Sequence, residues 1–139
     1  MGEDLNPDQR RLWDRGLVLL RAGAGYEAHE VWEQLWHGLR RSPQPAEQRL
    51  GRLLRALIQL AAGLHLRAQG RWSGARAVFD RAAAGIAALE QQPESPPRLL
   101  GLELRALRRS LAAAASDGEH DPRSDPGIGW RWPEDIAGP

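Results

Sequence analysis

The chain of 139 residues lacks three common residue types: it has no cysteine, no lysine and no threonine. Without cysteine there can be no disulfide framework and no thiolate that binds a metal or attacks a substrate. No run of about 18 apolar residues occurs, so nothing in the sequence predicts a membrane span. Residues 1–6 lack the basic start and apolar core of an export signal, and we therefore expect a cytoplasmic location.

A charge excess of either sign is also lacking. The 19 arginines nearly balance the 18 acidic residues, and the formal net charge is +1. Because so small a net charge creates no strong field for a polyanion, we expect no nucleic-acid partner and no membrane partner. Apolar residues make up 42% of the chain, which is enough for one globular domain with its own core.

Hydrophobic residues recur at helical spacing almost throughout, and no segment convincingly indicates a strand. Asn6 is a candidate N-cap, Pro7 suits a first helical position and Gln9 can close a capping box. Ser95 and Pro96 make a similar start for the last helix. We expect an all-α fold, a single compact bundle of about five helices, with helices near residues 7–21, 26–39, 46–69, 71–92 and 96–117.

The composition changes near residue 117, where proline, glycine and aspartate become frequent. We expect residues 1–116 to form the helical bundle domain and residues 117–139 to form an extended tail. The tail carries Trp130 and Trp132, which are unusual in a free polar segment. It is therefore expected to pack on the bundle or on a neighbouring subunit.

One short pattern occurs twice, 47 residues apart. Gly23, Ala28 and Trp32 are repeated as Gly70, Ala75 and Phe79. In each copy glycine breaks the chain, alanine allows a close helix approach and an aromatic ring follows one turn later. The repetition predicts that the first four helices form two antiparallel helical hairpins of similar packing.

Residues 26–37 concentrate the groups that can bind a metal or transfer a proton. At 100° per residue, His29, Glu33 and His37 form an i, i+4, i+8 ladder at the edge of an apolar stripe. His65 falls within the apolar stripe of the next helix. The predicted polar cluster comprises Glu27, His29, Glu30, Glu33, Gln59 and His65.

Two interpretations of this cluster remain open. As a metal site, His29 and His65 would supply imidazoles and Glu33 or Glu30 a carboxylate to one divalent cation between facing helices. As a buried polar network, the same groups would fix which helices pair and in what register, with no cofactor. The sequence contains no second Glu-x-x-His element and no His-Glu-x-x-His motif, which favours the network over the metal site.

Three segments resemble the motifs of domain-of-unknown-function family 309. These are residues 22–36 with their Glu-Ala-His-Glu core, residues 57–65, and Gly70 with Gly74-Ala75. The resemblance covers about residues 10–90. It implies a small all-helical bacterial or archaeal protein with no assigned activity, and so it informs the fold more than the function.

The sequence therefore supports two functional hypotheses. The first is an uncharacterised interaction or scaffold module, associating as a homo-oligomer or with a protein partner, in which the His/Glu cluster is structural. The alternative is a metal-dependent enzyme or small-ligand binder that uses His29, Glu30, Glu33 and His65. Because no complete catalytic set is present, the sequence favours a role without catalysis.

Overall fold

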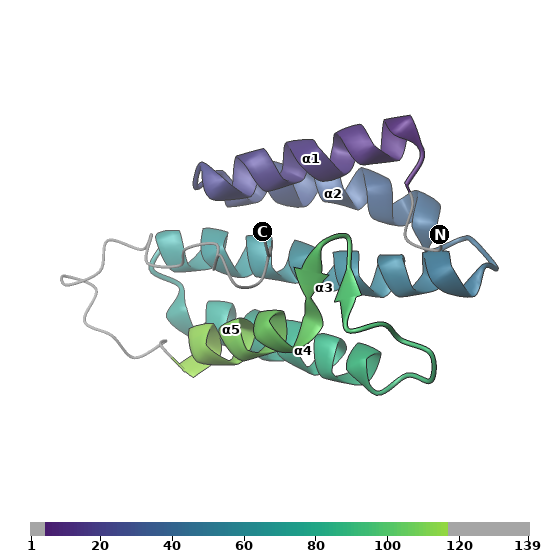
Figure 1. Cartoon of the computed structure of the whole chain (residues 1–139). Helices are drawn as coiled ribbons and strands as arrows, with labels where there is room; N and C mark the ends of the chain where they lie inside the picture. Colours follow the sequence, from purple (N-terminus) through teal and green to yellow (C-terminus); the bar gives the residue numbers. More distant parts are fainter. Residues whose placement is uncertain (1–4, 117–139) are drawn as a thin grey trace.

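The computed structural model describes residues 5–116, which fold into five helices and one small sheet (Figure 1). The prediction of an all-α bundle of about five helices is confirmed. The predicted tail of residues 117–139, with Trp130 and Trp132, lies outside the described residues. No helix within residues 5–116 is both long and apolar enough to cross a bilayer. The elements are α1 (Pro7–Arg21), α2 (Gly25–Leu39), α3 (Pro45–Ala68), α4 (Trp72–Glu90), β1 (Arg98–Leu99), β2 (Leu102–Glu103) and α5 (Leu104–Ser116).

The start of α1 is fixed by the predicted capping box. The Asn6 side chain accepts a hydrogen bond from the Gln9 backbone N–H at 2.8 Å, and the Gln9 side chain accepts one from the Asn6 N–H at 3.0 Å. Two amide groups that the helix leaves without partners are thereby satisfied. Pro7 occupies the first turn, where its missing N–H costs nothing.

Successive helices reverse direction and lie side by side, so that α1 packs on α2, α2 on α3, α3 on α4 and α4 on α5 (Figure 1). The two antiparallel hairpins are thus present, with α5 added to the second. Helix α3 is the centre of the bundle, because α2 and α4 cover two of its sides. Its sequence predicted an apolar stripe on one side, whereas Ala56 and Leu60, outside that stripe, are also buried.

The 47-residue repetition corresponds to two hairpins of matching geometry. Gly23 and Gly70 have positive φ angles of 81° and 77°, the left-handed conformation that glycine adopts readily at a helix end. A Cβ atom on Gly16 would overlap the ring of Trp32, and one on Gly63 would overlap the ring of Phe79. In both hairpins a glycine therefore gives room for a buried aromatic ring of the following helix.

The predicted start of the last helix at Ser95–Pro96 is wrong, because α5 begins at Leu104. A second proline, Pro97, disfavours the helical conformation at Pro96. Residues 98–103 instead form a two-stranded antiparallel hairpin, with Leu99 opposite Leu102. Its turn residues, Leu100 and Gly101, both have positive φ (51° and 79°), as a tight two-residue hairpin turn requires.

Arg67, near the end of α3, is a buried charged residue with 3% of its surface exposed. Its guanidinium lies 5.2 Å from the ring centre of Trp72 and 5.7 Å from that of Phe79. Aromatic faces attract this cation, so the α4 rings can cover it. The periodicity of α3 alone carries no information about those rings.

Candidate functional site

The close contact between α2 and α3 begins at Gly25, the first residue of α2. A Cβ atom at this position would lie 2.7 Å from the carbonyl oxygen of Ala61 on α3. The absence of a side chain thus lets the two backbones meet at the start of α2. This contact brings the residues that follow on α2 next to His65, in the fourth-last position of α3.

The predicted ladder on α2 is present. His29 Nε2 lies 3.0 Å from Glu33 Oε1, and His37 Nε2 lies 4.0 Å from Glu33 Oε2. Glu33 is thus the carboxylate between two imidazoles on one edge of the helix.

The expectation that this network is buried is wrong. The exposed fractions of the His29, Glu33 and His37 side chains are 29%, 41% and 52%. The reason is geometric: each step of four residues rotates about 40° around the helix, so a ladder that starts at the edge of the buried stripe moves outward. The pairs therefore lie at the surface, where they confer little stability.

Tyr26 joins the ladder to α3. Its ring centre lies 6.4 Å from that of His29, with the planes 16° apart, and 5.4 Å from that of His65. Half of the tyrosine remains exposed nonetheless, at 50%. The tyrosine is therefore an exposed aromatic side chain with an imidazole ring from each of two helices beside it.

The other predicted site residues take no part in this cluster of rings. Glu27 and Glu30 are exposed on α2, and Gln59 is half-buried on α3. Among the described residues, no hydrogen bond or ion pair links any of these three side chains to His29 or His65. The structure thus places His29 and His65 beside Tyr26, and Glu33 beside His29, and it leaves Glu27, Glu30 and Gln59 apart from them.

The placement of His29 bears on both chemical hypotheses. Its Nε2 contacts Glu33, and its Nδ1 is buried without a hydrogen-bond partner among the described residues. A general base must reach the proton that it removes, and the buried Nδ1 is not placed to do so in this arrangement. Within residues 5–116, no three His, Asp or Glu side chains are placed to share one metal ion. The ring of His29 lies beside that of Tyr26, with the two centres 6.4 Å apart.

The C-terminal end of α2 carries a basic group that is stacked on an aromatic ring. The guanidinium of Arg40 lies 4.9 Å from the ring centre of the half-buried Trp36, one helical turn earlier. This i, i+4 spacing of arginine and tryptophan was the available signal. Tyr26 was likewise treated only as part of a motif, although it lies three residues before His29.

The exposed groups of α2 form one continuous line. Tyr26, Glu30, Glu33, His37 and Arg40 are each exposed or partly exposed and follow one another at intervals of four and three residues. That spacing keeps them on one face of a helix, opposite the buried stripe. We call these five residues the α2 outer stripe.

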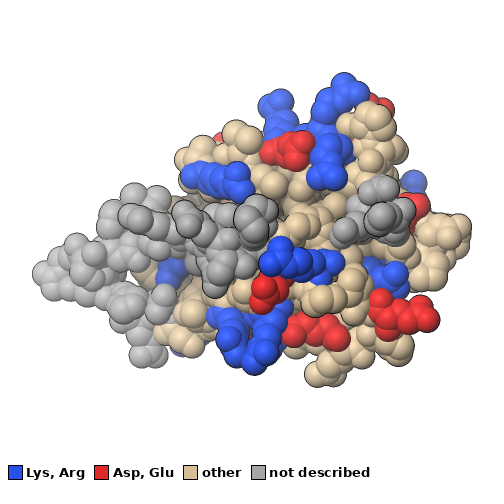
Figure 2. Space-filling view, in the orientation of Figure 1, with Lys and Arg blue, Asp and Glu red and all other residues tan. Residues whose placement is uncertain are grey.

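Figure 2 shows the charges on one face of the molecule, with α1 in its upper part and the hairpin and α5 below. Arginines gather over α1, and acidic side chains lie among them, so that no single continuous basic patch covers this face. Arg11, for example, pairs with Asp8 at 2.8 Å.

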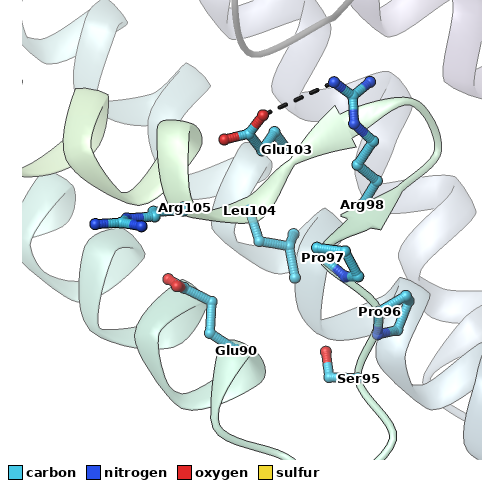
Figure 3. A pocket seen from close by; sticks show the side chains of 8 residues that line it. All are labelled: Glu90, Ser95, Pro96, Pro97, Arg98, Glu103, Leu104 and Arg105. Carbon is cyan, nitrogen blue, oxygen red and sulfur yellow. Dashed lines mark ion pairs between the residues drawn. The ribbon is translucent and has the colours of Figure 1, made fainter.

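A pocket of about 380 Å³ lies away from α2, between the end of α4, the hairpin and the start of α5 (Figure 3). Its two carboxylates are already paired: Glu103 lies 3.8 Å from Arg98, and Glu90 lies 2.6 Å from Arg108. None of the predicted site residues lines this pocket, whose walls are Glu90, Ser95, Pro96, Pro97, Arg98, Glu103, Leu104 and Arg105.

Comparison with known proteins identifies one family. Residues 13–78, from α1 to the first part of α4, match the model of a domain of unknown function, DUF309. The matched range contains the α2 outer stripe, His65 and both copies of the repeated pattern. No curated protein and no solved structure matches the chain. Over residues 13–78, this match confirms the predicted resemblance to the family described as Domain of unknown function (DUF309).

Proposed function

We propose that this protein is a protein-interaction module and that the α2 outer stripe is its binding surface. The observation that carries the proposal is the position of Tyr26, which is 50% exposed while its ring packs beside His29 and His65. Tyrosine, tryptophan and arginine supply most of the binding energy at protein interfaces. A ring already held in place loses little conformational freedom when a partner covers it.

The rest of the stripe suits the border of such an interface. Glu30, Glu33 and His37 are polar and solvent-accessible around the tyrosine. Arg40, stacked on Trp36, adds a second residue type that is common among binding anchors. The surface thus combines an aromatic side chain at one end with charged groups that select the partner and its orientation.

Photo-crosslinking from position 26 in the native host tests this proposal. Tyr26 is replaced by the photoreactive analogue p-benzoylphenylalanine, and Val18, which is 64% exposed on α1, provides the matched control position. We expect a covalent protein–protein product from position 26 and none from position 18. Equal yields at the two positions, or no product at position 26, would refute the proposed binding surface.

A further inference from the structure

We propose that the partner of the α2 outer stripe is a second copy of this chain, bound with its α2 antiparallel across a two-fold axis. This inference rests on the proposed function and names its partner. The observation behind it is the order of charges along the stripe. Glu30 and Glu33 come first, and His37 and Arg40 follow. The stripe is therefore acidic at one end and basic at the other.

Such a stripe is complementary to itself only when it is reversed. In a parallel pair each residue faces its own copy, so Glu33 meets Glu33 and Arg40 meets Arg40. Like charges in contact disfavour that arrangement. In an antiparallel pair the acidic end of one helix faces the basic end of the other, and the two-fold axis produces every contact twice.

The charges also select the register. Stripes with alternating intervals of three and four residues pair in a small number of antiparallel registers. In one register the two-fold axis crosses α2 at the level of Leu35. Glu30 then lies opposite Arg40 of the second copy, and Glu33 lies opposite its His37. The numbers of facing residues sum to 70 in this register. In the neighbouring register they sum to 63, and Glu30 of one copy lies opposite Glu33 of the other. Of these two registers, only the first sets both glutamates of one stripe opposite basic residues of the other.

The tyrosine and the arginine supply contacts beyond charge. In the selected register Tyr26 lies beyond the C-terminal end of the second copy's α2, towards its exposed loop to α3. Arg40 is held over Trp36, so its guanidinium is already in place for the carboxylate of Glu30. Each end of the paired helices therefore has one aromatic contact next to an ion pair.

The strength of this dimer follows from the exposure of its charges. Ion pairs between exposed side chains contribute little each, and salt screens them. We therefore expect the dimer to dissociate as salt is added, from a range of about 20 mM to about 500 mM, which shortens the screening length from about 20 Å to about 4 Å.

Sedimentation equilibrium of the full chain with charge-exchange variants tests the proposal. Arg40→Glu and Glu30→Arg each place like charges opposite one another, and we expect each to weaken the dimer at least about tenfold. The double variant, with both changes, restores opposite charges and should regain dimerisation to within about threefold. Arg41→Glu and Glu27→Arg make the same charge changes off the stripe and should leave the dimer unaffected. Circular dichroism checks that each variant retains the helical fold.

The outcomes distinguish this inference from the proposed function. A chain that stays monomeric at low salt, or a double variant that fails to recover, overturns the antiparallel dimer. If the crosslinked product at position 26 then contains a different protein, the interaction surface stands and only its partner is wrong. If position 26 yields no product either, both proposals fail.

Discussion

The ring of Tyr26 on α2 lies 5.4 Å from the ring of His65 on α3, and it is this contact that connects the exposed stripe to the centre of the bundle. With His29 beside it as well, the tyrosine has a defined position although half of its surface is open. The orientation of the exposed anchor therefore depends on a residue of a different helix, 39 positions later in the chain.

His65→Ala tests that dependence. Removing the imidazole frees the Tyr26 ring, whose ordering on binding then costs about 0.5–1.5 kcal/mol. We expect the dimer measured by sedimentation to weaken by about twofold to tenfold, with the helical fold retained. Gln59→Ala, at a half-buried position of the same helix, is the control and should leave association unchanged. An unchanged dimer in His65→Ala would show that the tyrosine needs no support from α3.

The surface position of Glu33 makes a prediction about stability. Glu33→Ala removes the carboxylate between His29 and His37, but all three side chains are substantially exposed. Exposed pairs of this kind contribute about 0–1 kcal/mol. We expect the free energy of unfolding, measured by urea titration, to fall by less than about 1 kcal/mol. A loss of several kcal/mol would instead indicate the buried network that the sequence suggested.

At Gly63 on α3 we expect a substantial loss of stability, because a Cβ atom there meets the ring of Phe79. Gly63→Ala should lower the free energy of unfolding by about 1–3 kcal/mol, because the packed ring must move. Gly85→Ala is the matched control, because this glycine lies within α4 and nothing lies within 4 Å of a Cβ atom there. This substitution should raise the free energy of unfolding by about 0.5–1 kcal/mol. Stabilisation by both substitutions would contradict the close packing of Phe79 on α3.

Elemental analysis of the untagged protein tests the metal-dependent alternative. That hypothesis predicts about one divalent transition metal per chain, lost in His29→Ala. Because no three His, Asp or Glu side chains within residues 5–116 are placed to share one ion, we expect far less than one metal per chain in both proteins. A stoichiometric metal that disappears in His29→Ala would restore the metal site and shift attention to hydrolytic or oxidative activity.

Local patterns predicted most of the first four helices. The capping box at Asn6, the glycines at positions 23 and 70 and the four-residue intervals of the ladder all depend on neighbours within about one turn or two. The same reasoning failed at Ser95–Pro96, where a cap and a first-turn proline resembled a helix start. The deciding feature there is the second proline together with a tight turn at Leu100–Gly101, which reverses the chain before α5 begins.

The site was less predictable because it depends on contacts between helices. Periodicity on α2 places His29 and Glu33 within reach, but the position of His65 beside Tyr26 follows from how closely α2 approaches α3 at Gly25. The exposed fraction of the ladder side chains also depends on which other elements cover α2. The hydrophobic periodicity of a single helix does not reveal those neighbours. Arg67 illustrates the same limit, since the rings that bury it belong to α4.

The most direct test of the antiparallel dimer is a distance between spin labels, which a chain without cysteine allows at single introduced positions. In the selected register, labels at Gln34→Cys in the two copies lie only about 3 Å apart along the helix axis, and labels at Glu27→Cys about 24 Å apart. We therefore expect electron–electron double resonance at low salt to give a clearly shorter distance at position 34 than at position 27. Equal short distances at both positions, or no coupling between labels at either, would contradict the account.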